Sequence, residues 1–407
     1  MQVRNKSPRT IKGGVNAVDG FTAAGLSAGI KENGSPDLAL IYSEMPCTVA
    51  AVFTRNRFQA PPLLLDKRHL RGRQGRAIIA NSGNANALTG ERGVQDAEAM
   101  AETTAQTLGI PTRSVYVAST GVISEFLPTQ KIVRAIPRLA SSLSDKGSGA
   151  AAEAIMTTDT FPKEFALIGK VGQDNIRVGG IAKGSGMIHP NMATMLAFLA
   201  TDATIDPGLL QEGLRQAVDR SFHRITVDGE TSTNDMVLLF ANGTKGKRIR
   251  TKGRAFGQFI AILEKGCLSL AKMIVKDGEG ATKFIEINVV GAPSDQAARR
   301  IAMTIARSSL VKTAFYGEDA NWGRIMAAIG NASVPVPPEK IDLAFGPTLL
   351  LRGGTSLGKA AEAKTAVLLQ KREIRLTLSL HSGVGRSTVW TSDLSLDYVK
   401  INALYRT

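Results

Sequence analysis

Among the hydroxyl side chains of this sequence, Thr194 has the surroundings that an internal nucleophile needs. A small residue, Ala193, precedes it, and an apolar, strand-like run follows it. Once the chain is cut before Thr194, the α-amine of that residue, with a reference pKa of about 7.7–8.0, can accept the proton of its hydroxyl. The cut would begin with attack of the Thr194 hydroxyl on the Ala193 carbonyl, and water would open the resulting ester. An Ala-Thr pair alone is structural in most proteins, so this prediction depends on the rest of the sequence.

Other nucleophile and metal chemistries lack their motifs. The sequence contains no HExxH, paired CxxC, P-loop or GxGxxG, and Cys47 and Cys267 have no metal-ligand spacing, so we expect no metal site. We interpret the one G-x-S-x-G match, at residues 354–358, as a glycine-rich turn, because it lacks the expected order of serine, acid and histidine. A group of acidic residues lacks the EF-hand order of ligands and is interpreted as a hydrogen-bonded turn: Asp228, Glu230 and Asp235.

The charge of the chain fits acidic small molecules. Fifty Lys and Arg residues against 35 Asp and Glu give a net charge of +15. The basic residues are spread along the chain, and the densest run, at 67–73, is not interleaved with aromatic residues. This distribution favours a solvated basic surface over nucleic-acid binding, and carboxylate substrates suit the same charge. A non-enzymatic basic binding protein remains an alternative that the charge alone supports.

The elements that must position Thr194 are strands and helices in alternation. We expect strands at 77–80, 114–118, 236–240, 283–290, 341–345, 374–380 and 387–390, and a hairpin formed by 164–171 and 176–181. We expect helices at 95–108, 207–220, 254–275 and 294–308, with Ser294 as an N-cap. Residues 183–196 form a glycine-rich loop that leads into an apolar run, so Thr194 is expected where this loop enters a strand.

The mixture of hairpins and helices predicts an α+β fold with mixed α/β layers rather than a doubly wound sheet. The 407 residues suffice for two or three domains, and a Gly-Pro turn at 291–293 is the expected domain boundary. No apolar stretch approaches the length of a membrane span, and residues 1–20 contain no apolar leader segment. We therefore expect a cytoplasmic protein without membrane or nucleic-acid partners.

Residues 183–196, KGSGMIHPNMATML, resemble the cleavage-site signature of the glutamate N-acetyltransferase/ornithine acetyltransferase family, the bifunctional arginine-biosynthesis acetyltransferases. Further segments along the chain resemble the same family in the same order: Thr54 to Arg57, Asn81 to Ala87, Ser119 to Ile123, Thr157 to Asp159, Val227 to Asp235, Gly278 to Lys283, Asn321 to Arg324 and Tyr398 to Thr407. The long signature is highly specific, and the ordered set of matches extends the resemblance over the whole chain.

The resemblance implies a role for each of several residues. Thr194 would be the nucleophile, freed by cleavage after Ala193, and Thr120 with Gly121 would form the oxyanion hole. The residues implied to contact substrate, together with Thr194, are Thr157, Lys183, Glu279, Asn402 and Thr407. Their chemistry suits an amino-acid substrate, since a lysine can meet a carboxylate, a glutamate can accept an ammonium and an asparagine can both donate and accept.

The resemblance also implies a self-processing, N-terminal-nucleophile-type acetyltransferase fold with a smaller C-terminal α/β domain. Cleavage would give an alpha fragment, 1–193, and a beta fragment, whose residues 194–290 complete the catalytic domain and whose residues 291–407 form the C-terminal domain. Two alpha and two beta fragments would assemble. The implied reaction moves acetyl from N2-acetylornithine to glutamate without a metal or prosthetic group, and the bifunctional version also accepts acetyl-CoA as a co-substrate.

A hydrolase is the second interpretation of the same nucleophile. A self-processing aminopeptidase or amidase with an N-terminal threonine would use water, in place of glutamate, as the acyl acceptor. Lys183 and the tail from Asn402 to Thr407 favour the transferase, because they provide contacts for an amino-acid acceptor.

Overall fold

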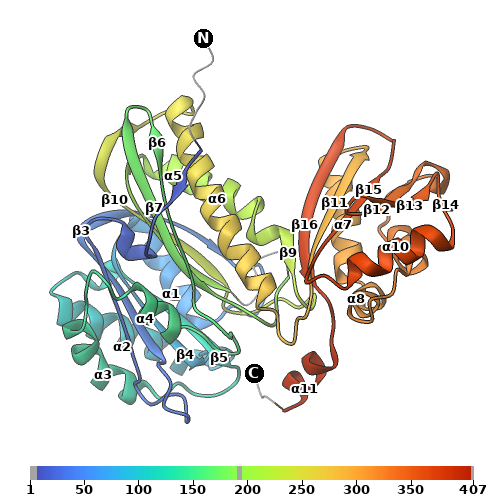
Figure 1. Cartoon of the computed structure of the whole chain (residues 1–407). Helices are drawn as coiled ribbons and strands as arrows, with labels where there is room; N and C mark the ends of the chain where they lie inside the picture. Colours follow the sequence, from blue (N-terminus) through green and yellow to red (C-terminus); the bar gives the residue numbers. More distant parts are fainter. Residues whose placement is uncertain (1–6, 190–194, 405–407) are drawn as a thin grey trace.

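The chain folds around two β-sheets in a computed structural model that describes residues 7–189 and 195–404 (Figure 1). Within those residues the larger sheet has nine strands in the order β1-β6-β7-β8-β10-β3-β4-β5, with β2 paired to β3. These strands are β1 (Arg9–Thr10), β2 (Phe21–Leu26), β3 (Leu38–Phe53), β4 (Gln74–Asn84), β5 (Val115–Val122), β6 (Lys163–Val171), β7 (Asp174–Lys183), β8 (Leu196–Ile205) and β10 (Met236–Ile249).

The smaller sheet contains most of the C-terminal third. Across the described residues its seven strands run in the order β14-β13-β12-β15-β11-β16-β9. These strands are β9 (Ile225–Thr226), β11 (Phe284–Ala292), β12 (Asp342–Phe345), β13 (Thr348–Arg352), β14 (Thr355–Ser356), β15 (Glu373–Ser379) and β16 (Gly385–Ser392). Strand β9 comes from the middle of the chain, so it connects the first part of the molecule to the second.

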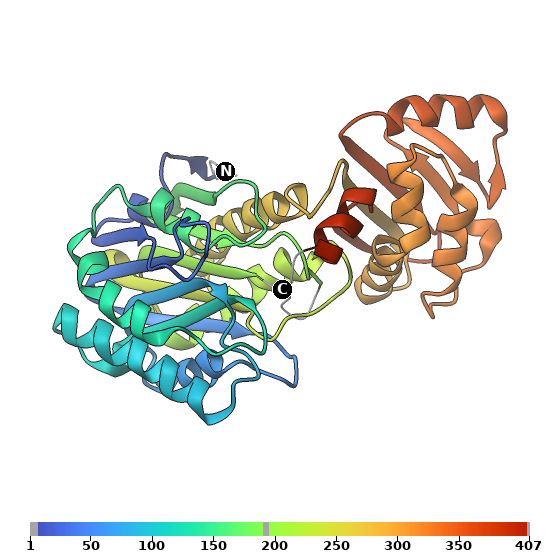
Figure 2. The same cartoon turned by 90° about the horizontal axis from the view of Figure 1, so that it is seen from below.

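Helices cover both sheets. They are α1 (Pro61–His69), α2 (Gly90–Leu108), α3 (Thr129–Ser141), α4 (Ser148–Ala154), α5 (Pro207–Asp219), α6 (Arg254–Lys276), α7 (Asp295–Arg307), α8 (Ser309–Tyr316), α9 (Trp322–Gly330), α10 (Lys359–Leu369) and α11 (Leu396–Leu404). Helices α5 and α6 pack on one face of the larger sheet, and α7 packs on the smaller sheet. Helix α11 lies between the two sheet units (Figure 2).

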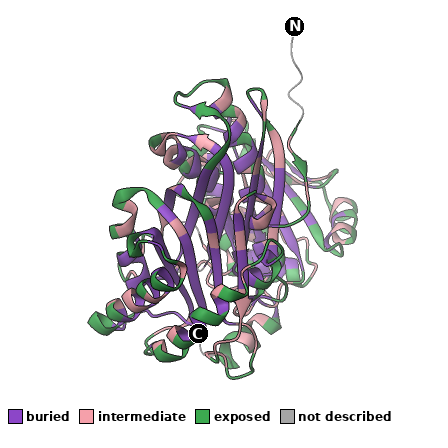
Figure 3. Ribbon diagram, turned by 90° about the vertical axis from the view of Figure 1, so that its left-hand side faces the viewer, coloured by how far each residue is buried: buried purple, intermediate pink, exposed green. Residues whose placement is uncertain are grey.

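Strand β8, which begins two residues after Thr194, lies inside the larger sheet. It pairs antiparallel with β7 and parallel with β10. Its side chains alternate, so that Ala197 and Leu199 contact the core under α5 and α6, while Phe198 and Ala200 join the core on the opposite face. Both faces are therefore covered, and Figure 3 shows the strands of this sheet buried over most of their length.

The mixed α/β fold predicted from the sequence is confirmed, with two sheets and no doubly wound order. The predicted hairpin is β6 and β7, and Ser294 caps α7 by accepting a hydrogen bond from the N–H of Ala297. The domain boundary expected at 291–293 stays a prediction. Strand β11, at Phe284–Ala292, already pairs with β15 and β16, so this sheet begins before that turn.

Candidate active site

A pocket forms where the ends of β5 and β7, the segments around residues 157, 228 and 279, and helix α11 meet. Its lining residues are Ala85, Thr120, Gly121, Ile123, Thr157, Thr158, Lys183, Gly186, Met187, Asp228, Glu230, Ser232, Asn234, Glu279, Tyr398 and Asn402. Six of the residues that the family resemblance singled out therefore line one cavity: Thr120, Gly121, Thr157, Lys183, Glu279 and Asn402. These residues come from positions up to 282 apart in the sequence, and only the fold brings them together.

Thr120 and Gly121 lie at the end of β5, where its parallel pairing with β4 becomes irregular. Gly121 has a φ of +132°, a conformation that side chains with a Cβ rarely adopt. A Cβ at this position would also lie 2.3 Å from the carbonyl carbon of Gly83. The close approach of the two strands thus requires glycine, and it fixes the backbone at the place where an oxyanion hole is expected.

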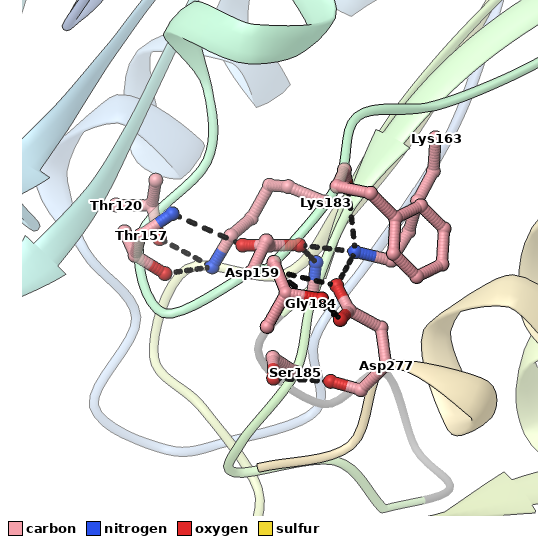
Figure 4. A network of polar contacts seen from close by, with 10 residues as sticks. Thr120, Thr157, Asp159, Lys163, Lys183, Gly184, Ser185 and Asp277 are labelled. Atoms are coloured by element: carbon pink, nitrogen blue, oxygen red, sulfur yellow. Dashed lines mark hydrogen bonds and ion pairs between the residues drawn. The ribbon is translucent and has the colours of Figure 1, made fainter. Parts of the chain in front are cut away.

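Lys183 is the last residue of β7, and its side chain is buried within the polar end of the pocket. Its Nζ donates to Thr157 Oγ1 at 2.8 Å and lies 3.3 Å from Thr120 Oγ1 (Figure 4). Burial lowers the pKa of Lys183, while the neighbouring carboxylate of Asp159 acts in the opposite direction. A lysine in this position can meet a substrate carboxylate or a developing oxyanion.

Three buried charged residues, which we call the ion cluster, lie beside Lys183: Asp159, Lys163 and Asp277. Lys163 Nζ lies 2.6 Å from Asp159 Oδ1 and 2.5 Å from Asp277 Oδ2 (Figure 4). No motif in the sequence pointed to Lys163 or Asp277, and Asp159 stood out only as part of the segment from Thr157 to Asp159. The pairing of Lys163 with Asp277 spans 114 residues, so no local pattern in the chain could have indicated it.

Glu279 and Asn402 meet across the opposite side of the pocket. Asn402, on α11, donates from Nδ2 to Glu279 Oε2 at 2.8 Å. The Glu279 backbone N–H donates to the carbonyl of Ser185 at 3.2 Å, so this residue is attached to the loop that follows β7. Glu279 is largely buried, and its carboxylate is placed to accept an ammonium group of a ligand.

The absence of a side chain at Gly186 leaves space for the Glu279 carboxylate. A substitution at Gly186 should therefore weaken substrate binding. A Cβ at position 186 would lie 2.3 Å from the Glu279 carboxyl carbon, so Gly186→Ala must displace that carboxylate. Because the obstacle is the end of a side chain, we expect a rise in KM of about tenfold, the equivalent of about 1.4 kcal/mol, with little loss of stability. Gly257→Ala, where a Cβ meets nothing within 4 Å, is the matched control. An unchanged KM in steady-state kinetics would contradict this role for Glu279.

The acidic residues 228 and 235 hold the chain on both sides of residues 190–194. Asp228 accepts backbone hydrogen bonds from Met187 at 2.5 Å and Ile188 at 2.9 Å, as well as one from Glu230. Asp235 accepts one from Met195 at 3.0 Å. Burial raises the pKa of Asp228 and raises that of Asp235 well above its usual range. Asp228 thus forms the hydrogen-bonded turn predicted from the sequence.

The predicted nucleophile Thr194, its neighbour Ala193 and the terminal Thr407 lie outside the described residues. Met195, which follows Thr194 in the sequence, donates a backbone hydrogen bond to Asp235. Asp235 directly follows Asn234, which lines the pocket. The Nδ1 of His189 lies 3.2 Å from Thr226 Oγ1. Burial and the charge of Arg307 lower the pKa of His189 to about 4, so this ring is neutral at pH 7.

The family of the chain follows from comparison with known proteins. A model of the ArgJ family matches residues 22–407. The arginine biosynthesis bifunctional protein ArgJ of Geobacter sulfurreducens is 50% identical over 391 residues, which cover 96% of this chain and all of that relative. The chain belongs to the ArgJ family. The resemblance predicted from the motifs is therefore confirmed, and with it an enzyme of arginine biosynthesis.

Two solved structures are also similar to this chain. The arginine biosynthesis bifunctional protein ArgJ of Bacillus halodurans is 45% identical, with a TM-score of 0.49, and the match covers 51% of this ArgJ-family chain and 98% of that one. The ornithine acetyltransferase of Mycobacterium tuberculosis, complexed with ornithine, is 42% identical, with a TM-score of 0.43, and the match covers 45% of this chain and 98% of that one.

Within residues 7–189 and 195–404, no helix of this ArgJ-family protein is both long and apolar enough to cross a membrane. The same residues contain no cluster of three or more histidine, cysteine or carboxylate side chains arranged to hold a metal ion.

Proposed function

We propose that this protein transfers an acetyl group from N2-acetylornithine to glutamate through an acetyl-threonine intermediate. The observation that carries the proposal is the convergence of Thr120, Gly121, Lys183 and Glu279 on one pocket of an ArgJ-family chain. The reaction needs no metal or prosthetic group. Acetyl-CoA is a second acetyl donor under this proposal, and its thioester would enter the same first half-reaction.

The first half-reaction acetylates the enzyme. The Thr194 hydroxyl attacks the acetyl carbonyl of N2-acetylornithine, and the α-amine of Thr194 takes the hydroxyl proton. The Thr120 hydroxyl and the Gly121 N–H donate to the oxyanion of the tetrahedral intermediate. When the carbonyl re-forms, the C–N bond to ornithine breaks, the departing amine receives the proton, and an ester of Thr194 remains.

The second half-reaction restores the enzyme. The α-amine of glutamate attacks the ester carbonyl, the Thr194 oxygen leaves and takes back a proton, and N-acetylglutamate is released. The Lys183 ammonium binds the α-carboxylate, a group present in both ornithine and glutamate. The Glu279 carboxylate accepts hydrogen bonds from the ammonium group of ornithine. Thr157 and Asn402 hold Lys183 and Glu279 in place, and Thr407 is proposed as a further substrate contact.

Mass spectrometry of the C-terminal fragment tests the intermediate. After incubation with N2-acetylornithine alone, we expect one added acetyl group on the peptide that begins at Thr194, and its loss when glutamate is added. A peptide that stays unmodified under rapid acid quenching would overturn the mechanism. Ornithine release at a rate that does not depend on glutamate would instead support the aminopeptidase or amidase alternative.

Cleavage between Ala193 and Thr194 is proposed to create the nucleophile, giving fragments of 193 and 214 residues. We predict that the fragments stay together without a covalent link. Strand β8 of the second fragment lies between β7 of the first and β10 of the second, and β10 in turn pairs with β3 of the first. Separating the fragments would therefore break two strand pairings and expose a continuous core.

Size-exclusion chromatography of the cleaved protein checks this prediction. The two fragments, which form two bands on a denaturing gel, should elute together in one peak under native conditions. The mass of that peak should fit two copies of each fragment. Separate native peaks for the two fragments would contradict the arrangement of β8 and β10.

A further inference from the structure

The ion cluster of Asp159, Lys163 and Asp277 is buried beside the pocket without lining it. The three side chains are at most 1% exposed, and their two contacts are 2.6 Å and 2.5 Å long. Burying three charged side chains has a large desolvation cost, which their mutual attraction must offset. A protein in which well-packed apolar residues replace such a cluster is often at least as stable. Stability alone is therefore a weak explanation for the ion cluster.

Asp159 holds the backbone at pocket-lining Thr157 and directly after pocket-lining Lys183. Its Oδ2 accepts the N–H of Thr157 at 3.0 Å, and its Oδ1 accepts the N–H of Gly184, the residue after Lys183, at 2.7 Å. Burial by itself raises the pKa of Asp159, but the charges of Lys183 and Lys163 outweigh that effect and lower it to about 2. Asp159 is thus a carboxylate throughout the working pH range.

Asp277 holds the backbone at Thr160 and the side chain of Ser185. Its carboxylate accepts the N–H of Thr160 at 3.0 Å, and its backbone carbonyl accepts the Ser185 hydroxyl at 2.5 Å. The carbonyl of Ser185 then accepts the N–H of Glu279. Lys163 joins the carboxylate of Asp159, which holds the backbone at Thr157 and Gly184, to Asp277 (Figure 4). Asp277 is in turn connected to Glu279 through its backbone carbonyl and Ser185.

Several charged groups face Lys183 from the elements packed around it. Asp159, Asp235 and Glu279 favour its protonated form, while Lys163 and Lys31 oppose it. Burial opposes the charge more strongly than any of them. Within the ion cluster, Asp159 therefore stabilises the positive charge of Lys183, and Lys163 destabilises it.

We propose that Asp159, Lys163 and Asp277 are positioning residues of the acetyl-transfer site. Together they hold the backbone around Thr157, Lys183 and Glu279, and Asp159 and Lys163 also control the charge of Lys183. The proposal rests on the function proposed above for the role of Lys183 in substrate binding. The protonation of Lys183, however, can be measured without substrate.

Two substitutions should shift the titration of Lys183 in opposite directions. Asp159→Asn removes a negative charge that favours protonated Lys183, so the pKa of Lys183 falls. Lys163→Met removes a positive charge that disfavours it, so the pKa of Lys183 rises. We expect shifts of about one pH unit each way, which is typical of the loss of one neighbouring charge. A cluster with a purely structural role has no reason to produce opposite signs.

Carbon-13 NMR of protein labelled at lysine Cε measures this titration directly, with the Lys183 signal assigned by its loss in Lys183→Met. Asp277→Asn is the matched control, because in the described part of the chain its side chain contacts Lys163 but neither Lys183 nor Gly184. We expect Asp277→Asn to shift the titration by less than half as much as Asp159→Asn. Should Lys163→Met not fold, Lys163→Arg, which keeps the charge, must leave the Lys183 titration near the wild-type position.

Kinetics supply the second readout. If protonated Lys183 binds the substrate carboxylate, the alkaline limb of kcat/KM moves to lower pH in Asp159→Asn and to higher pH in Lys163→Met. Shifts of the same sign, or no shift in a folded variant, would overturn the inference. A wild-type enzyme without acetyl transfer between ornithine and glutamate would refute the proposed function instead, and the NMR titration would still decide the charge control.

Discussion

Replacing Thr194 with alanine is expected to leave a single full-length chain without acetyltransferase activity. The hydroxyl of Thr194 is the proposed attacking group in both the cleavage and the transfer, and its α-amine, the proposed base, exists only after the cleavage. Losing both groups should lower kcat/KM by at least about a thousandfold, as is typical when a catalytic nucleophile is removed. A denaturing gel reports the cleavage, and an assay with labelled N2-acetylornithine and glutamate reports the transfer.

Two further variants make the Thr194 experiment decisive. Thr194→Ser keeps a hydroxyl and an amine, so some cleavage and some activity should return. Thr251→Ala, in an exposed turn between β10 and α6, removes a threonine that does not line the pocket and should cleave normally. Two gel bands from Thr194→Ala would mean that another residue cuts the chain, and the self-processing mechanism would have to be abandoned.

Elements with a strong local pattern were the part of the fold that the sequence could predict. The hairpin of β6 and β7 has a turn at Gly172 and Gln173 between two strand-like segments, and α7 has a serine cap and an apolar stripe. Helix α6 likewise repeats apolar residues at a helical period over its whole length. In each case the residues that decide the structure lie within about 20 positions of one another.

The rest of the fold depends on contacts between distant residues. Strand β3 extends over Leu38–Phe53 although Pro46 lies within it, because an irregular pairing with β4 between Tyr42 and Cys47 accommodates the interruption. The assembly of the smaller sheet depends on distant contacts in the same way. β11 is a typical buried strand by sequence, but its partners β15 and β16 are about 90 to 110 residues away.

The candidate site shows the same division. The chemical types of Thr120, Lys183 and Glu279 were evident from motifs, but their meeting in one pocket depends on the pairing of β4 with β5 and of β7 with β8. From the sequence, Lys163 was only the residue before a predicted strand. No residue near it in the sequence indicates that it pairs with two buried carboxylates. Buried ion pairs across long sequence separations become visible only when the chain is folded.

Gly121→Ala is expected to have the second large effect, on both activity and stability. Alanine disfavours the φ of +132° at this position, and its Cβ would lie 2.3 Å from the Gly83 carbonyl carbon and 2.5 Å from the Asn84 nitrogen. Since both obstacles are backbone atoms, β4 and β5 must move apart, and the N–H of residue 121 leaves its place in the proposed oxyanion hole. We expect cleavage and transfer to slow by at least about a hundredfold, the typical effect of losing one oxyanion-hole donor.

Thr120→Val separates the loss of the oxyanion hole from the loss of strand packing. Valine has nearly the shape of threonine, and Thr120 is almost fully buried at the end of β5, so the strand can keep its position while the hydroxyl is lost. We expect a fall in kcat of about a hundredfold with a small change in melting temperature, whereas Gly121→Ala should lower both. If Thr120→Val transfers acetyl groups at the wild-type rate, the Lys183 ammonium, 3.3 Å from that hydroxyl, becomes the better candidate for the second oxyanion donor.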